Sequence, residues 1–114
     1  MRITVKRNNA VLAEEAEVAD TTTERLVGLI GRHEIPRGTA LVLPGCRQIH
    51  TFLMRFAIDL VYVDADWRVL CTRRCISPWR FGPYCPKAAY AIELRSGTIS
   101  AVGIELGDQL HTCE

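Results

Sequence analysis

The sequence has little that would place it in a membrane, outside the cell or on a nucleic acid. No segment approaches the roughly 20 consecutive apolar residues that cross a bilayer. The opening residues hold no apolar stretch long enough for a signal peptide. With 14 Lys and Arg against 13 Asp and Glu, the net charge of +1 creates no overall field for nucleic acid or an anionic membrane. We therefore expect a cytoplasmic protein that binds neither.

A metal site and a disulfide framework also lack their usual sequence signals. The cysteines number five, an odd count, and no two of them form a Cys-x-x-Cys pair. The three histidines, His33, His50 and His111, are scattered along the chain. Metal-finger spacing is therefore absent, and a secreted disulfide scaffold would normally use an even set. We expect free thiols, no metal and no cofactor.

What is present indicates one mainly β domain that covers residues 1–114. Apolar residues make up 48% of the chain, which is ordinary for a soluble globular protein of this length. Many short runs with alternating or continuous apolar character are bounded by turn residues, and this pattern is typical of a β-sandwich or barrel with mostly antiparallel strands. The expected strands are 3–5 (as an edge strand), 11–18, 39–43, 60–63, 67–72, 90–94 and 109–112.

Helical signals are few. Thr21 with Glu24 three residues later forms a capping box, and apolar residues follow at helical spacing, so the sequence predicts one capped helix at about 21–32. A short helical turn at about 97–102 is expected after Ser96 and Gly97. Strand should therefore exceed helix.

The stretch from Gly45 to Asp64 is the most informative part of the chain. It is dense in apolar residues, yet His50, Arg55 and Asp59 interrupt it. Residues 50–54 look extended, and Met54 would lie on the same side as His50. Because a buried charge needs a partner, we expect Arg55 and Asp59 to meet at a bend between two strands, with His50 nearby. The cluster is either a polar support of the core or the floor of a site.

Residues 73–88 form the second candidate region. They combine prolines and glycine with Trp79, Arg80 and other aromatic and cationic residues, without a regular period. Long structureless loops in small domains are usually functional. Interleaved cations and aromatics also occur in single-stranded nucleic acid sites, but the near-neutral charge argues against that use. We interpret the segment as a recognition loop.

Three blocks give the chain a family resemblance. They are Glu24-Arg25-Leu26-Val27-Gly28-Leu29-Ile30-Gly31-Arg32, then Ile49-His50-Thr51-Phe52-Leu53-Met54-Arg55-Phe56-Ala57-Ile58-Asp59, then Gly103-Ile104-Glu105-Leu106-Gly107-Asp108. In this order they resemble a prokaryotic family known as domain of unknown function 192. The resemblance implies a mainly β, sandwich-like domain with one or two helices and no established activity.

Two functions stay open at this point. The first is a non-enzymatic binding or accessory domain that recognises a small anionic ligand or a protein segment through the Arg55 region and the 73–88 loop. The second is a small hydrolase-like enzyme that uses His50 and Asp59, with or without Cys46 as nucleophile. No set of nucleophile, base and oxyanion donors is legible, and this favours binding. The candidate ligand-binding residues are His50, Met54, Arg55, Asp59, Trp79 and Arg80.

Overall fold

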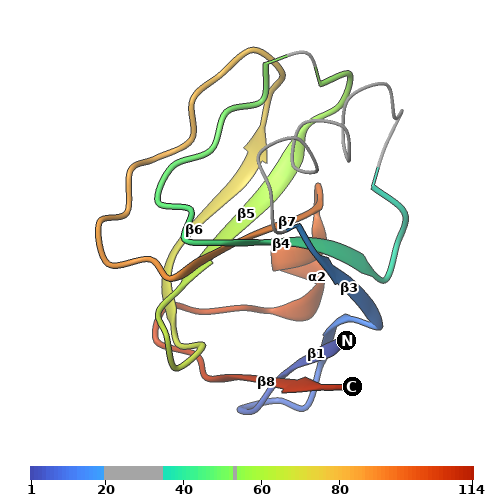
Figure 1. Cartoon of the computed structure of the whole chain (residues 1–114). Helices are drawn as coiled ribbons and strands as arrows, with labels where there is room; N and C mark the ends of the chain where they lie inside the picture. Colours follow the sequence, from blue (N-terminus) through green and yellow to red (C-terminus); the bar gives the residue numbers. More distant parts are fainter. Residues whose placement is uncertain (20–34, 53) are drawn as a thin grey trace.

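Two β-sheets packed face to face make up the protein (Figure 1). The computed structural model describes residues 1–19, 35–52 and 54–114. The helix expected at 21–32 lies outside these residues. The described elements are β1 (Arg2–Val5), β2 (Val11–Ala13), β3 (Glu15–Val18), β4 (Thr39–Pro44), β5 (Ile58–Val63), β6 (Val69–Ile76), β7 (Tyr90–Arg95), α2 (Thr98–Val102) and β8 (Leu110–Cys113). The mainly β prediction and the short helical turn are both confirmed.

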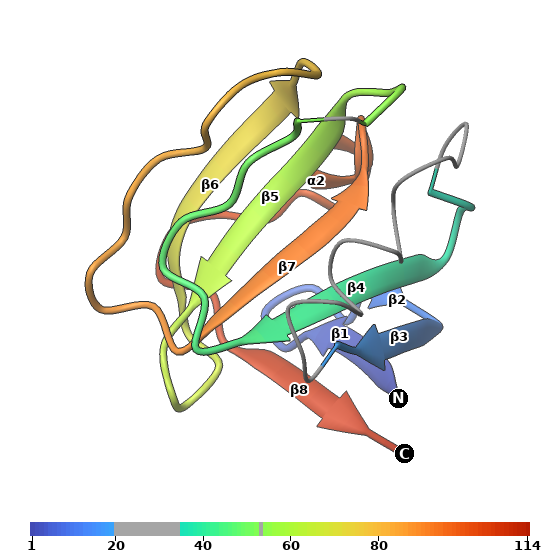
Figure 2. The ribbon, with the colours of Figure 1, turned by 45° about the horizontal axis from the view of Figure 1, so that its top comes forward.

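The larger sheet has the order β3-β4-β7-β5-β6, and the smaller has the order β2-β1-β8. All pairings are antiparallel except that of β3 with β4. Figure 2 shows β4, β7, β5 and β6 side by side, with the small sheet beneath them. The hairpin expected from residues 60–63 and 67–72 is present as β5 and β6.

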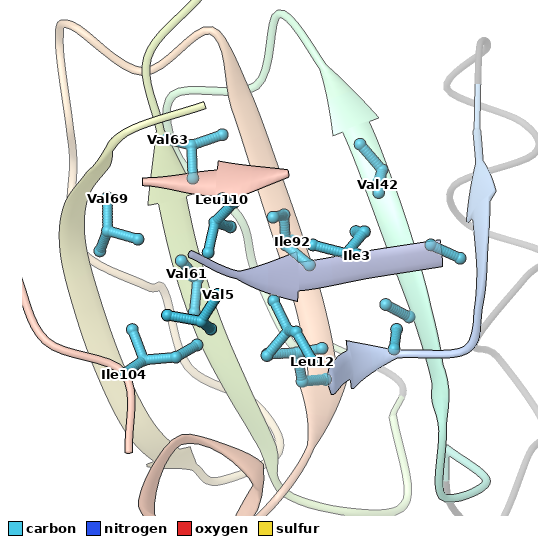
Figure 3. Packing of buried hydrophobic residues seen from close by; sticks show 14 of the residues in the cluster. Ile3, Val5, Leu12, Val42, Val61, Val63, Val69, Ile92, Ile104 and Leu110 are labelled. Carbon is cyan, nitrogen blue, oxygen red and sulfur yellow. The ribbon is translucent and has the colours of Figure 1, made fainter. Parts of the chain in front are cut away.

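The main core lies between the two sheets. Strand β1 crosses the larger sheet so that Ile3 and Val5 face Val61 and Ile92 (Figure 3). All four side chains are fully buried. A second cluster fills the opposite face of the larger sheet, where Tyr62 and its neighbours meet the long loops. Because β5 has an apolar cluster on both sides, all six of its residues are buried, as its continuous apolar sequence predicts.

Two strand predictions were wrong in detail. Residues 3–5 were expected at an edge, but β1 pairs with β2 on one side and β8 on the other. Residues 11–18 were expected as one strand, but the chain bends at Glu14, so that β2 belongs to the smaller sheet and β3 to the larger. One long strand and two short strands in different sheets have the same alternation of apolar and polar residues. The sequence alone therefore did not reveal the bend at Glu14.

Two loop predictions also need correction. The extended run expected over 50–54 is not a strand in the described residues 50–52 and 54: His50 makes a single bridge to Phe81, and the Met54 N–H donates to the Thr51 carbonyl at 3.2 Å. The recognition loop was expected to begin at residue 73, but β6 continues to Ile76, so the irregular segment starts at Ser77. In the structure, residues 45–51 and 77–89 instead form a pair of neighbouring loops.

Candidate binding surface

Residues 45–51 and 79–89 run side by side along one flank of the larger sheet (Figures 1 and 2). Backbone hydrogen bonds connect them throughout. The N–H of Gly45 donates to the Ala89 carbonyl at 2.7 Å, that of Cys85 to Arg47 at 2.8 Å, and that of Gly82 to Ile49 at 2.9 Å. A series of backbone hydrogen bonds thus holds the two loops together, although they are not a strand pair.

Thr51 holds the outer end of this loop pair. Its side chain is fully buried, and its hydroxyl donates to the Ser77 carbonyl at 2.6 Å and accepts from the Arg80 N–H at 3.0 Å. Its own N–H donates to the Arg80 carbonyl at 2.8 Å, and the Trp79 N–H donates to the Thr51 carbonyl at 3.0 Å. One threonine therefore satisfies most of the backbone groups of the 77–80 turn.

The inner side of the loop pair is fixed to the larger sheet. The Tyr62 hydroxyl donates to the Pro83 carbonyl at 2.7 Å, and burial raises the pKa of this phenol far above its usual value, so Tyr62 stays a neutral donor. Gly82 is buried against the same sheet. A Cβ at Gly82 would lie 3.0 Å from Ile49 Cγ1 and 3.3 Å from Leu60 Cδ2, which explains why glycine stands there.

The outer side of the loop pair carries an aromatic cluster, which we define as His50, Phe52, Trp79 and Phe81. Phe52 is at its centre: its ring centroid lies 5.0 Å from that of His50, 6.0 Å from Trp79 and 4.9 Å from Phe81. Trp79 is nevertheless 59% exposed and Phe81 66% exposed. Large aromatic side chains gain most of their stabilisation from burial, so a contiguous exposed group of them indicates an interaction surface.

The two chain segments that carry the aromatic cluster have charges of one sign. Residues 35–58 and 67–92 contain no Asp or Glu at all. Their exposed cations are Arg37, Arg47, Arg55, Arg68, Arg73, Arg74, Arg80 and Lys87. The ion pairs formed within the described ranges join Arg2 to Glu14 and Arg7 to Glu105 and Asp108, so they neutralise none of these cations. A near-neutral protein thus has a locally positive surface.

The structure separates Asp59 from this surface. Asp59 is fully buried, and its carboxylate accepts from the N–H groups of Cys75 at 2.9 Å, Gly97 at 3.1 Å and Ile99 at 2.9 Å. Because side chains alternate along a strand, Asp59 projects toward the same face as Val61, whereas Tyr62 reaches the loop pair on the other face. The expected meeting of Asp59 with Arg55 and His50 was wrong.

The other predicted site residues are placed as follows. His50, Arg55, Trp79 and Arg80 are exposed, whereas Met54 is buried in the second core cluster. The His50 Nδ1 accepts from the Phe52 N–H at 3.3 Å rather than from a catalytic partner. The Cys46 thiol is buried and donates to the Gln48 carbonyl at 3.1 Å. The surface therefore contains His50 and Trp79 together with Phe52 and Phe81, which were not among the candidate ligand-binding residues.

The remaining expectations concern ions, thiols and membranes. The five cysteines are free. Within the part of the chain that the structure describes, His, Cys, Asp and Glu do not come together in a group suited to a metal ion. In the same residues, no helix has both the length and the apolar character needed to cross a bilayer.

These features define a class: a small two-sheet β protein whose loops present an aromatic surface among arginines. Over residues 3–112 the chain matches the model of the DUF192 family, described as an uncharacterized ACR. The chain therefore belongs to this family.

Similar proteins support this assignment, and a solved structure shares the fold. The chain is 36% identical over 104 residues to a UPF0127 protein of Pyrococcus furiosus, covering 85% of each. It is 32% identical over 111 residues to a UPF0127 protein of Thermococcus sibiricus, covering 92% of this chain and 70% of the other. It is similar in fold to a crystal structure of a protein of unknown function from Novosphingobium aromaticivorans, with a TM-score of 0.83 and 21% identity over 98% of this chain and 84% of that one.

Proposed function

We propose that this protein is a non-enzymatic binding module that recognises an acidic, extended segment of a partner protein through the aromatic cluster and the cations beside it. The observation that carries the proposal is the exposure of Trp79 and Phe81 at 59% and 66%, although both rings contact Phe52. These side chains already lie in ordered contacts before a partner arrives. A preformed aromatic surface loses little conformational freedom on binding, which favours affinity.

The chemistry of the partner follows from charge. The two segments that carry the cluster, residues 35–58 and 67–92, contain no Asp or Glu, so an incoming acidic group meets no carboxylate from the loops that hold the rings. Exposed Arg80 and Arg55 offer planar guanidinium groups that bind carboxylates with two parallel hydrogen bonds. A partner with apolar residues for the rings and acidic residues for the arginines satisfies both parts of the surface.

The hydrolase alternative has no comparable support. An acid–base pair would need His50 and Asp59 within hydrogen-bond reach. Both Asp59 oxygens accept from backbone N–H groups instead. Binding is therefore the function that we put forward.

Synthetic peptides that alternate Asp or Glu with Leu, Phe or Trp test the proposal directly. We expect them to bind in the micromolar range and to change the fluorescence of Trp79, while peptides with Lys in place of the acids do not bind. Trp67, the other tryptophan, stacks on Tyr90 at 4.6 Å and serves as an internal reference. Trp79→Ala should weaken binding by at least tenfold without unfolding the protein.

Tyr84→Ala is the matched control, because Tyr84 is 62% exposed on the same loop but makes no ring contact with the cluster. It should leave peptide affinity nearly unchanged. Two results would contradict the proposal. One is equal binding of acidic and basic peptides. The other is tighter binding of oligothymidylate than of any peptide, with the steep salt dependence of phosphate contacts, which would make the surface a nucleic-acid site.

A further inference from the structure

The outer edge of β6 is open to pairing with another strand. Strand β6 has eight residues, more than any other described strand, and it is the last strand of the larger sheet. It pairs with β5 at one edge, and within the described residues no strand lies at its other edge. Such an edge presents backbone N–H and C=O groups, to which an extended chain from another molecule can bond.

The start of this edge is already occupied, and the rest is open. The Val69 N–H donates to the Asp108 carbonyl at 2.8 Å, and the Gly107 N–H donates to the Val69 carbonyl at 2.9 Å. The chain itself therefore uses the outer edge of β6 for backbone pairing at this point. Across the described residues, the backbone of 70–74 forms no hydrogen bond beyond those with β5. The open part of the edge begins at Leu70.

The end of β6 is accessible to a partner from both faces. Arg73, Arg74 and Cys75 are three consecutive exposed residues, whereas every residue of the neighbouring β5 is buried. Successive side chains of a strand point to opposite faces, so a consecutive exposed run shows that neither face is covered there. The ion pairs formed within the described ranges involve neither arginine. Both guanidinium groups therefore remain available to a partner.

The open edge leads toward the aromatic cluster. Arg73 lies opposite Leu60, which belongs to the core cluster beneath the loop pair. Residues that lie opposite each other in a sheet share one face, so Arg73 is on the face that carries the loops. Figure 2 shows the 77–89 loop continuing directly from the arrowhead end of β6. A strand added along this edge would therefore pass Arg73 and approach the turn that carries Trp79.

The charges on the edge decide which kind of strand it accepts. A second copy of this chain would bring both arginines of each copy into one short ladder. Like charges that face each other across strands destabilise the pair, and charged edge residues are a common means of preventing self-pairing. The same two arginines, Arg73 and Arg74, attract acidic side chains, because cross-strand pairs of opposite charge are stabilising. The edge is therefore suited to an acidic strand rather than to a second copy.

We propose that the open edge of β6, from Leu70 to Arg74, pairs with the backbone of an acidic, extended segment of a partner protein, which becomes an additional strand of the larger sheet. The partner is that of the proposed function, on which this inference rests. Main-chain hydrogen bonds to β6 hold the segment, while its acidic and apolar side chains contact Arg73 and the aromatic cluster. In strand addition, the main chain supplies affinity and alternate side chains supply specificity.

Backbone-methylated peptides test this pairing. The probe is a synthetic peptide of alternating Glu and Leu that ends in Phe, and its binding to the full chain is measured by calorimetry. An extended peptide directs the N–H groups of alternate residues to opposite sides. N-methylation of one alternate set should therefore weaken binding by about tenfold or more, through loss of the hydrogen bonds to β6. N-methylation of the other set is the matched control and should change the dissociation constant by less than about twofold.

Two variants and an exchange measurement locate the peptide on the protein. Arg73→Glu should weaken binding of the unmodified peptide by about tenfold, because it places a like charge beside the incoming acids. Arg37→Glu makes the same charge change at an exposed position before β4, three strands away in the sheet order, and should leave binding nearly unchanged. Amide hydrogen exchange within residues 70–74 should slow when the peptide is bound.

The outcomes separate this pairing from the proposed function. If the unmodified peptide binds but the two methylation patterns have equal effects, strand pairing is overturned and the proposed function stands. If the unmodified peptide does not bind, both are overturned. Dimerisation of the protein alone that the peptide reverses would assign the edge to a second copy, and this too would overturn the pairing with a partner segment.

Discussion

Asp59 and Asp108 are two buried carboxylates that connect distant parts of the chain in different ways. Asp59 accepts only backbone N–H groups, from β6 and from the start of α2. Asp108 accepts Nε and Nη2 of Arg7 at 2.9 and 3.1 Å, and the Glu105 N–H at 2.8 Å. The side chain of Asp108 is 6% exposed and that of Arg7 is 45% exposed.

The difference shows that the donors around a buried carboxylate decide which substitutions and which solvent conditions weaken its hydrogen bonds. Backbone N–H donors at Asp59 cannot be lost by a side-chain change, and the carboxylate that accepts from them is fully buried. The Arg7–Asp108 pair involves a cation that water and salt can screen. We therefore expect Asp59 to be indispensable and insensitive to salt, and Asp108 to contribute less and to respond to pH and ionic strength.

Asp59→Ala should have the largest effect. It leaves three N–H groups without their acceptor, that of Ile99 from a fully buried bond and those of Cys75 and Gly97 from partly buried ones. At a cost of roughly 1–3 kcal/mol each, we expect a total loss of about 3 kcal/mol or more. Urea unfolding measures the change in the free energy of unfolding. Asp59→Asn is the control that keeps one acceptor oxygen, and it should recover part of the loss. If Asp59→Ala lowers the free energy of unfolding by less than about 1 kcal/mol, Asp59 is no more important to stability than we expect Asp108 to be.

Asp108→Ala should have a smaller effect. It removes the acceptor of the Glu105 N–H and the partner of Arg7, but Arg7 also donates to the Gly103 carbonyl at 2.7 Å and remains partly hydrated. We expect a loss of about 1–3 kcal/mol in urea unfolding at neutral pH. Added salt should reduce the difference from the unmodified protein. A loss as large as that of Asp59→Ala would contradict the comparison.

The pH dependence of stability sharpens the comparison further. The hydrogen bonds from Arg7 lower the pKa of Asp108 below its usual value. The resulting stabilisation is therefore present above the unfolded-state pKa of Asp, about 3.9, and disappears as the pH falls from there through the lower folded-state pKa. In Arg7→Gln, the melting temperature should therefore fall less steeply between neutral and acid pH than in the unmodified protein, as measured by thermal unfolding. An unchanged slope would show that Arg7 is not the cause.

Arg55→Ala should have the smallest effect. Arg55 is exposed, and Asp59 does not depend on it, so we expect a change within about 0.5 kcal/mol in urea unfolding. Arg2→Ala, at another exposed cation that does form an ion pair, is a suitable control. A loss of several kcal/mol for Arg55→Ala would mean that Asp59 needs a cation after all.

The strands were mostly predictable, because a strand in a small β protein follows the local apolar pattern. The continuous apolar run of β5 correctly predicted a strand buried on both faces. The runs that became β4, β6 and β7 were also recognised, within a few residues at their ends. The errors arose at β1, β2 and β3, where the assignment to a sheet depends on partners far away in sequence.

The candidate surface was predictable only in part. Trp79 and Arg80 were correctly located on an exposed loop, because proline, glycine and exposed aromatics are local signals. Phe52 and Phe81 were not among the candidate ligand-binding residues, since nothing local distinguishes a core phenylalanine from one on a surface. The absence of acidic residues over 35–58 and 67–92 was visible in the sequence and would have pointed to both segments together.

The sequence by itself determined that this chain is a β protein with a polar interruption at Asp59 and an aromatic, cationic loop, since these follow from residue type and short-range pattern. Only the tertiary structure decided that the Asp59 carboxylate accepts hydrogen bonds from the backbone of β6 and α2. It also decided that the His50 ring lies against Phe52 on the other side of the sheet. The physical reason is that a buried carboxylate takes whichever donors the packing brings within hydrogen-bond distance. Residues as distant in sequence as Asp59 and Ile99 become neighbours because β5 pairs with β7, where Asp59 lies opposite Leu94, and α2 follows β7.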